Sequence, residues 1–208
     1  MTMLRNQLRP AIVLTLVLCV ITGLVYPGIV TGLAQVLFPH QANGSLITGA
    51  DGTVIGSELI GQQFSRPEYF HPRPSAAGGG YDDTLSAGTN LGPTSVKLAD
   101  TLVMQAVDSA VKNEGAVKGT IPSDMATSSG SGLDPHISPA NAFLQVGRVA
   151  RARHADSAAV RALVQQHIEG RQFGFFGEPR VNVLRLNLAL DSLSHTRSSS
   201  TSTSGVPR

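Results

Sequence analysis

Hydrophobic residues are concentrated in one uninterrupted run near the start of the chain. Residues 11–38, AIVLTLVLCVITGLVYPGIVTGLAQVLF, contain no charged side chain. A helix needs about 20 apolar residues to cross the roughly 30 Å hydrocarbon core of a bilayer, and this run is longer. A cleaved signal peptide is the alternative, but its apolar part usually has only about 7–15 residues. The pattern therefore predicts a retained transmembrane helix over residues 11–38.

Beyond this run the hydrophobic pattern changes to short periodic segments, which are typical of a folded domain. Residues 41–65 contain brief apolar runs separated by the turn signal ADGT, and they predict short strands. Apolar residues recur at helical spacing in residues 93–115, 138–153 and 157–171, which predicts three helices. Ser138 and Asp156 are typical N-terminal caps for the last two helices, and Gly115 is a typical stop for the first.

The remaining segments complete the predicted architecture. The prolines of residues 64–74 predict a rigid irregular segment. Asn182 and the leucines at alternate positions from 184 to 190 predict a half-buried strand over residues 182–190. Residues 193–208 are rich in Ser and Thr and poor in apolar residues, so they predict a disordered tail. The fold class is therefore α+β: a single N-terminal transmembrane helix followed by one compact mixed α/β domain over residues 39–192.

The distribution of charge predicts how the chain is oriented. Arg5 and Arg9 are the only charged residues before Asp51, and basic residues favour the cytoplasmic side of a membrane. Residues 1–10 are therefore expected in the cytoplasm and the domain outside it, which in a bacterium with two membranes means an inner-membrane anchor and a periplasmic domain. The rest of the chain has 14 basic and 14 acidic residues. Without a basic surface, nucleic-acid binding has no electrostatic support.

Small residues line the apolar run and predict a partner within the membrane. Gly23, Gly28 and Gly32 would let a second helix approach closely, which is how transmembrane helices associate. Pro27 lies between them and is expected to kink the helix or end its regular part. Cys19 is the single cysteine of the chain, which excludes an intrachain disulfide and a thiolate metal site.

The sequence offers no convincing template for catalysis or metal binding. Asp134 and His136 are close in sequence, but LDPHISP is typical of a turn that leads into the Ser138 cap. We expect His71 to be an ordinary hydrogen-bonded histidine, because no second His or Cys follows at metal-ligand spacing. No G-x-S-x-G elbow is present, and the glycines of residues 130–132 lack the lysine of a Walker loop. We therefore predict no catalytic residue and no metal site.

Residues 75–95, SAAGGGYDDTLSAGTNLGPTS, leave two interpretations open. Glycine at Gly78–Gly80 and Gly88 allows positive φ and close backbone approach, so the segment suits a loop that packs tightly against a partner. Asn90 is typical of such turns. The same residue types also occur in loops that hold a phosphate through backbone N–H groups.

Four motifs in this order resemble those of one known family: YFHPRPSAAGGGYD, GTNLGPT, SGSGLDPHISP and GEPRVNVLRLNLAL. From the anchor to about Leu190 the chain is similar to the C subunit of the bacterial Kdp-type potassium-transporting P-type ATPase. The resemblance implies a non-enzymatic, single-pass accessory subunit, assembled with a potassium-channel-like subunit, a P-type ATPase subunit and a small helical subunit. It also implies a catalytic chaperone that supports ATP use, with ATP and potassium handled by the partners.

The family's glycine-rich stretch is likened to the Leu-Ser-Gly-Gly-Ser signature of ABC transporters, which implies a nucleotide contact. Residues 85–89 match this stretch, with alanine in place of a glycine. The charge distribution, however, places these residues outside the cell, where there is essentially no ATP. We therefore interpret the stretch as a loop that docks on the channel-like subunit, formed by Ser86, Ala87, Gly88, Thr89 and Asn90. A direct nucleotide-binding activator and an unrelated anchored periplasmic enzyme or binding module are the alternatives.

Overall fold

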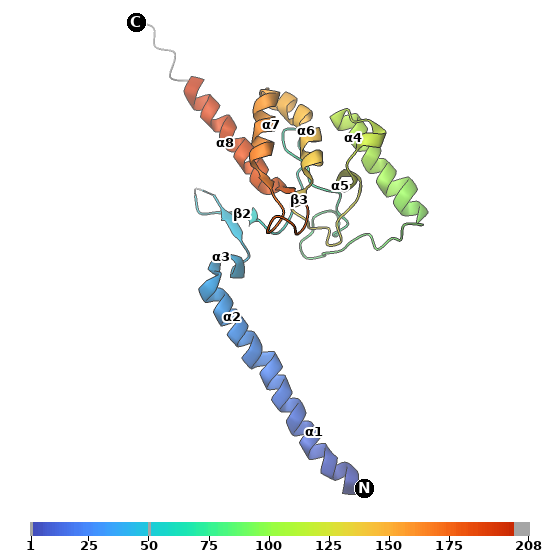
Figure 1. The fold of residues 1–208 in the computed structure, drawn as a ribbon, viewed down its shortest axis with the longest axis vertical. Coiled ribbons are helices and arrows are strands. Elements are labelled where there is room, and N and C mark those ends of the chain that lie inside the picture. The colour runs from blue at the N-terminus through green and yellow to red at the C-terminus, as the bar shows by residue number, and fades with distance from the viewer. Residues whose placement is uncertain (1, 50, 202–208) are drawn as a thin grey trace. The chain divides into compact units, whose positions relative to one another are not determined.

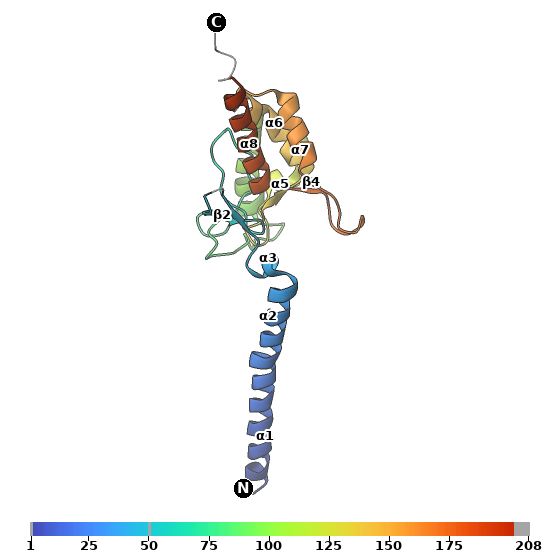
Figure 2. The same cartoon turned by 90° about the vertical axis from the view of Figure 1, so that its left-hand side faces the viewer.

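The computed structural model describes residues 2–49 and 51–201. The chain separates into two units, residues 1–55 and residues 56–208. Figures 1 and 2 show the helices and strands of both units.

The first unit is dominated by one long helix. The helix consists of α1 (Thr2–Val20), a π-helical turn η1 (Ile21–Val25) and α2 (Tyr26–Leu37). Within it, residues 6–37 are long and apolar enough to cross a membrane, and the side chains described there are almost all exposed. The predicted apolar helix over residues 11–38 is thus present as a helix that begins earlier and ends at Leu37.

The π turn lies immediately before Pro27. Its last hydrogen bond runs from the Tyr26 N–H to the Ile21 carbonyl, one residue further back than in an α-helix. Proline has no N–H to donate and its ring crowds the carbonyl four residues earlier. A local change in the hydrogen-bonding pattern is the expected response, and the regular α-helix is interrupted here as predicted.

After the helix the chain forms a short turn and a hairpin. The turn is α3 (Pro39–Ala42), and the hairpin joins β1 (Leu46–Thr48) to β2 (Val54–Ser57). The Asp51 carboxylate accepts hydrogen bonds from the Thr53 N–H at 3.1 Å and from its hydroxyl at 2.7 Å. This contact stabilises the turn. The presence of β1 and β2 confirms the short strands predicted on each side of ADGT.

The second unit combines helices with a small antiparallel sheet. Its helical elements are η2 (Lys97–Val103, π), α4 (Met104–Glu114), η3 (Lys118–Thr120, 3₁₀), α5 (Ser123–Ala126), α6 (Pro139–Ala152), α7 (Ser157–Gln166) and α8 (Val183–Thr201). The sheet has the order β3 (His136–Ile137), β5 (Arg180–Asn182) and β4 (Ile168–Glu169). In its register, Ile137 and Ile168 both lie opposite Val181. Helices α6, α7 and α8 lie side by side in both views.

Local signals in the sequence explain three helix boundaries. Ser138 accepts a hydrogen bond from the Asn141 N–H at 3.1 Å, and Asp156 accepts one from the Ala158 N–H at 3.0 Å. Both are N-terminal caps that satisfy an otherwise unpaired helix donor. Gly115 ends α4 with a φ of +69°, in the left-handed region that favours glycine. The predicted helix starts and stop are confirmed.

The core lies between the helices and the sheet. It contains residues from α6, α7, α8 and the strands, together with one aromatic ring from the irregular segment; its most buried large apolar members are Phe70, Ile137, Val149, Val160, Val164, Val181 and Leu186. No helix or strand forms between residues 58 and 95, which confirms the irregular segment predicted over residues 64–74. The irregular segment is therefore anchored to the core by the side chain of Phe70, and not by a helix or strand of its own.

Buried amide side chains hold the backbone of the irregular segment in place. The Asn187 side chain accepts from the Phe70 N–H at 2.9 Å and donates to the Phe70 carbonyl at 3.0 Å. Gln145 pairs with the N–H and carbonyl of His71 in the same way, at 2.7 and 3.0 Å. Two helices thus satisfy the backbone groups that a neighbouring strand would otherwise satisfy.

The strand predicted over residues 182–190 is wrong. Only the first of these residues lies in a strand, and α8 begins at Val183. The Asn182 side chain accepts a hydrogen bond from the Arg185 N–H at 3.1 Å, which is the geometry of an N-terminal cap. Val183, Leu186 and Leu190 are buried at helical spacing. Leucines at alternate positions include pairs four residues apart, such as Leu186 and Leu190, which lie on one face of a helix. The Asn182 cap and the burial of these two leucines favour the helix over the strand.

Part of the predicted disordered tail is also wrong. Helix α8 continues to Thr201, so residues 193–201 are helical. Residues 202–208 lie outside the described part of the chain.

Candidate functional site

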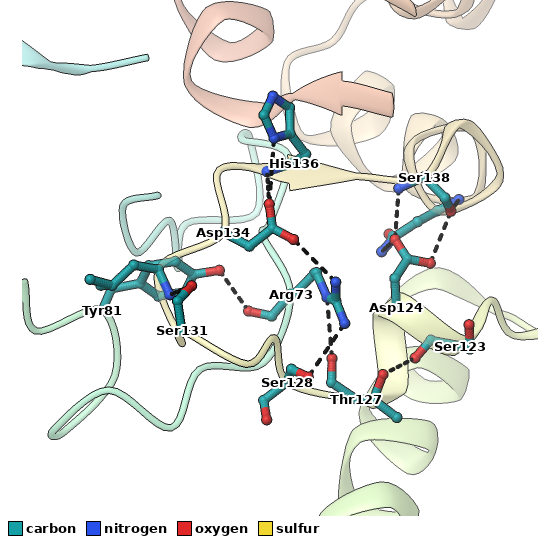
Figure 3. A network of polar contacts seen from close by, with 12 residues as sticks. Arg73, Tyr81, Ser123, Asp124, Thr127, Ser128, Ser131, Asp134, His136 and Ser138 are labelled. Atoms are coloured by element: carbon teal, nitrogen blue, oxygen red, sulfur yellow. Dashed lines mark hydrogen bonds and ion pairs between the residues drawn. The ribbon is translucent and has the colours of Figure 1, made fainter. Parts of the chain in front are cut away.

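The candidate site is a cluster of three loop segments in the second unit. It contains the end of the proline-rich segment, the glycine-rich loop of residues 75–95 and the segment of residues 127–136, which we call the serine–glycine segment. Figure 3 shows the polar contacts between them. Arg73 forms an ion pair with Asp134 at 3.1 Å, and its guanidinium also donates to the carbonyls of Thr127 and Ser128 at 3.4 Å. One partly buried side chain therefore joins segments more than 50 residues apart.

Asp134 is fixed from a second direction by His136. One Asp134 oxygen accepts from the His136 N–H at 3.0 Å and lies 3.4 Å from the ring Nδ1. Burial raises the pKa of Asp134, but the hydrogen bonds from His136 and the charge of Arg73 outweigh it and leave the pKa below its usual value. The carboxylate is thus ionised and paired at neutral pH. The predicted turn leading to Ser138 is confirmed, and it includes the short strand β3.

Asp124 fixes the start of α6 beside this cluster (Figure 3). One of its oxygens accepts from the Ser138 N–H at 2.7 Å and from the Asn141 side chain at 3.0 Å. The other accepts from the Ser138 hydroxyl at 2.9 Å. A carboxylate at a helix N-terminus is favourable for the helix dipole, and here it also joins α5 to the start of α6.

The glycine-rich loop is tied to the same cluster. The Ser75 hydroxyl donates to the Gly132 carbonyl at 2.6 Å and accepts from the Tyr81 N–H at 2.9 Å. The Tyr81 hydroxyl donates to the Arg73 carbonyl at 2.9 Å. Burial, and secondly the charge of Asp134, raise the pKa of Tyr81 far above its usual value. This phenol therefore stays neutral and acts as a hydrogen-bond donor.

The candidate loop residues contact the serine–glycine segment. The Ser86 hydroxyl and the Ala87 N–H both donate to the Ser131 carbonyl at 3.0 Å. A Cβ at Gly88 would lie only 2.9 Å from the Gly130 carbonyl oxygen. The loop is therefore closely packed, but against a segment of the same chain; its predicted docking on a partner stays a prediction. These contacts also use the Ser86 hydroxyl and the Ala87 N–H, two donors that a bound phosphate would need.

The predicted reason for glycine at position 88 needs one correction. Gly88 does not have positive φ; among the predicted positions, Gly78 (+54°), Gly80 (+111°) and Asn90 (+53°) do. Glycine at 88 is required by the close approach to another backbone and not by its own conformation. Thr89 is half-buried and Asn90 is exposed at the end of this stretch.

An open hollow of about 670 Å³ lies beside this network, and it is lined by residues of the serine–glycine segment together with Leu59, Ile60 and Arg73. Its single arginine is already neutralised by Asp134. Within residues 2–49 and 51–201, no group of three or more His, Cys, Asp or Glu side chains is placed to hold a metal ion. The hydroxyls of Ser75 and Ser86 donate to backbone carbonyls of the serine–glycine segment. These contacts join the loops to one another.

The charge partner that sequence reasoning missed is Arg148. No role was predicted for this residue from the sequence, but its side chain is only 8% exposed. It donates to the Glu114 carboxylate at 2.7 Å, to the Gln145 side chain at 2.7 Å, and to the carbonyls of Pro67 and Tyr69 at 2.6 and 2.8 Å. The sequence indicates a buried arginine only indirectly. A proline-rich segment that packs against a helix needs hydrogen-bond donors for its backbone carbonyls.

His71 is hydrogen-bonded, as predicted. Its Nε2 lies 3.0 Å from the Arg66 carbonyl. Burial and the nearby positive charge of Arg148 lower its pKa, while the hydrogen bond to Arg66 opposes this shift. The ring is therefore neutral, and its Nε2 donates.

The three glycines of the long helix face open space within the described chain. A Cβ at Gly23, Gly28 or Gly32 would meet nothing within 4 Å. Their predicted contact with another helix therefore stays a prediction.

The chain is similar to known proteins over most of its length. A protein-family model described as "KdpC: K+-transporting ATPase, c chain" matches residues 8–192. A protein of Gemmatimonas aurantiaca named "Potassium-transporting ATPase KdpC subunit" is 62% identical over 192 residues, covering 92% of this chain and 95% of the relative. Proteins with the same name from Koribacter versatilis and Caulobacter vibrioides are 56% and 53% identical, and each alignment covers 90% of this chain and 95% and 93% of the relative.

Proposed function

Because the chain belongs to the KdpC family, the c chain of the K+-transporting ATPase, we propose that it supports assembly and regulation of a high-affinity potassium uptake complex. It is an accessory subunit, and catalysis lies in a partner subunit. The single observation that carries the proposal is the family match over residues 8–192, which includes most of the long helix and nearly all of the domain.

We place the domain on the extracytoplasmic side of a bacterial inner membrane. The support is electrostatic: Arg5 and Arg9 precede the apolar helix, and the first charge after it is Asp51. On that side the domain meets essentially no ATP. ATP and potassium would then be handled by the P-type ATPase and channel-like subunits, and a small helical subunit would complete the complex.

The glycines of the long helix are proposed as its contact with a partner helix. In a regular α-helix, Gly23 and Gly28 would be about 140° apart around the axis. The π turn at residues 21–25 takes up roughly one extra residue, which reduces the separation to about 40°. Gly32 follows four residues later, about another 40° along the same side. The interruption before Pro27 thus brings three small residues toward one face, and such faces favour close helix packing.

The loop cluster is proposed as a rigid part of the docking surface on the channel-like subunit. The support is its construction: Arg73, Asp134 and Tyr81 fix the loops to one another, so that little conformational entropy is lost when a partner binds. Ser86, Thr84 and Leu85 remain exposed on the outer side of the glycine-rich loop. A nucleotide contact at this loop gains no support, since the Ser86 hydroxyl and Ala87 N–H already have partners.

The experiment is to purify an affinity-tagged chain from bacterial membranes that also express the other pump subunits. We expect the subunits to copurify, and the complex to hydrolyse ATP in response to potassium. Complexes prepared without this chain should need more ATP or assemble poorly. If the tagged chain purifies alone, or if its omission changes neither assembly nor ATP dependence, the proposal fails.

A further inference from the structure

A loop at the end of the small sheet carries three exposed aromatic side chains. Phe173, Phe175 and Phe176 are 88%, 64% and 58% exposed, and they are three of the seven phenylalanines in the chain. The loop connects β4 to β5, and Figure 2 shows it extending away from the helices beside β4. Isolated exposed apolar residues are common, but a cluster of large ones marks an interaction site.

The conformation of this loop is defined by backbone hydrogen bonds. Gln172 and Phe176 exchange two of them, each 2.9 Å long, and Arg171 pairs with both oxygens of Glu178 at 2.9 and 2.7 Å. Phe173 has a φ of +52°, a conformation that bulky residues rarely adopt. The rings of Phe175 and Phe176 pack together with centroids 4.2 Å apart. The loop therefore has a defined backbone, on which the rings of Phe175 and Phe176 pack together.

The charge of the loop distinguishes between protein and lipid as its partner. Residues 172–177, QFGFFG, contain no charge, and the two charged residues beside them neutralise each other. Helices that lie on membrane surfaces usually combine an apolar face with lysine or arginine that attract anionic lipids. A bilayer also requires no defined shape. A rigid, uncharged aromatic tip is instead typical of an anchor residue group that fills a pocket of another protein.

The available area supports the same conclusion. At the observed exposures the three rings offer roughly 300–500 Å² of apolar surface, given about 150–250 Å² for each whole aromatic side chain. One partner in a standard protein interface contributes about 800 Å². The loop alone would therefore supply about half of one side of a stable interface.

We propose that the loop of residues 171–178 inserts its phenylalanine tip into an uncharged apolar pocket on the extracytoplasmic face of another subunit of the potassium pump. This inference rests on the proposed function, because that function supplies both the partner and the side of the membrane. The phenylalanine tip is a second docking element, separate in sequence from the glycine-rich loop. It would provide most of the apolar contact with the partner subunit.

Photo-crosslinking tests the contact directly. Phe173 is replaced by p-benzoylphenylalanine in the tagged full-length chain, and the assembled complex is irradiated in the membrane. Val117, an apolar residue that is 69% exposed elsewhere in the domain, receives the same replacement as a control. We expect the probe at 173 to join this chain to a pump subunit more efficiently than the probe at 117. A crosslink only to lipid, only to a second copy of the chain, or to nothing in the assembled complex would overturn the proposal.

Serine substitution tests the energetic contribution of the rings. The triple variant Phe173→Ser, Phe175→Ser and Phe176→Ser should recover at most about one-tenth of the wild-type amount of the other subunits, as expected for clustered anchor residues. Its thermal unfolding should match wild type because the rings lie outside the core, and Val117→Ser should retain full recovery. Wild-type recovery by the triple variant refutes the inference alone. Failure of the wild-type chain to recover any subunit refutes the proposed function, and this inference with it.

Discussion

Substitution of Gly132 by alanine should destabilise the loop cluster strongly, whereas the same change at Gly130 should not. Gly132 has a φ of +69°, and a Cβ there would lie 2.6 Å from the Ala87 carbonyl oxygen and 2.7 Å from the Ala77 nitrogen. A Cβ at Gly130 would meet nothing within 4 Å, and its φ lies outside the left-handed region. The two positions share one segment and one substitution, so they form a matched pair.

The magnitude follows from two separate costs. A residue with a Cβ in the left-handed region costs about 1–2 kcal/mol, and overpacking against backbone that cannot move freely costs about 1–3 kcal/mol. Gly132→Ala should therefore lower the free energy of unfolding by about 2–5 kcal/mol. Because 1 kcal/mol corresponds to about 2–4 °C for a domain of this size, Tm should fall by at least about 4 °C. Gly130→Ala should stay within about 0.5 kcal/mol of wild type.

The assay is thermal unfolding of the full chain in mild detergent, followed by near-ultraviolet circular dichroism. The chain has no tryptophan and three tyrosines; Tyr81 lies in the glycine-rich loop and bonds to Ser75 and Arg73, whereas Tyr69 lies outside the loop cluster, beside Arg66. The signal therefore reports on packing around the loops. Equal Tm values for the two alanine variants would refute the reasoning, because they would show that the glycine-rich loop does not pack against Gly132.

Three further predictions test other parts of the account. Arg148→Met should destabilise the domain by about 3–5 kcal/mol in urea unfolding, because it leaves a buried carboxylate unpaired; the exposed Arg151→Met should change little, and equal effects would contradict the buried pair. Gly28→Leu and Gly32→Leu should reduce copurification with the pump without preventing membrane insertion, and unchanged recovery would show that this face meets lipid. Ser86→Ala should leave the ATP dependence of potassium-stimulated hydrolysis unaltered, whereas an approximately tenfold rise, the value of a hydrogen bond to a charged group, would restore a nucleotide contact.

Features encoded within a few neighbouring residues were predictable from the sequence. The apolar helix follows from a charge-free run, and the starts of α6 and α7 follow from Ser138 and Asp156, whose side chains bond to N–H groups two or three residues later. The positive φ at Gly115 is likewise a local requirement. Each of these features depends on residues within the helix or directly beside it.

Alternating leucines between 182 and 190 show where local reasoning fails. Leucines at alternate positions also place residues three and four apart, so the pattern is compatible with either period. The helix is fixed by the Asn182 cap and by burial of Leu186 and Leu190. The cap could have been read from the sequence; the burial depends on the rest of the fold.

The site shows the same limit for contacts that are distant in sequence. Arg73 and Asp134 are 61 residues apart, and Arg148 binds carbonyls about 80 residues earlier. Nothing in the neighbourhood of Arg148 distinguishes it from the exposed arginine three residues later. The close packing of residues 75–95 was predictable from their glycine content, but the neighbouring segment could be identified only from the fold.

The central claim is that an extracytoplasmic domain of this subunit acts within the assembled pump. It is tested by replacing Cys19 with alanine and introducing one cysteine at the exposed Asp83 or, separately, at Asn6. Intact spheroplasts are treated with a membrane-impermeant maleimide, and the tagged chain is purified with its partners. The account predicts that the cysteine at 83 is labelled in chains that copurify with the pump subunits, and that the cysteine at 6 is labelled only after the membrane is broken. Labelling at 83 only in broken membranes would place the domain in the cytoplasm and contradict the account.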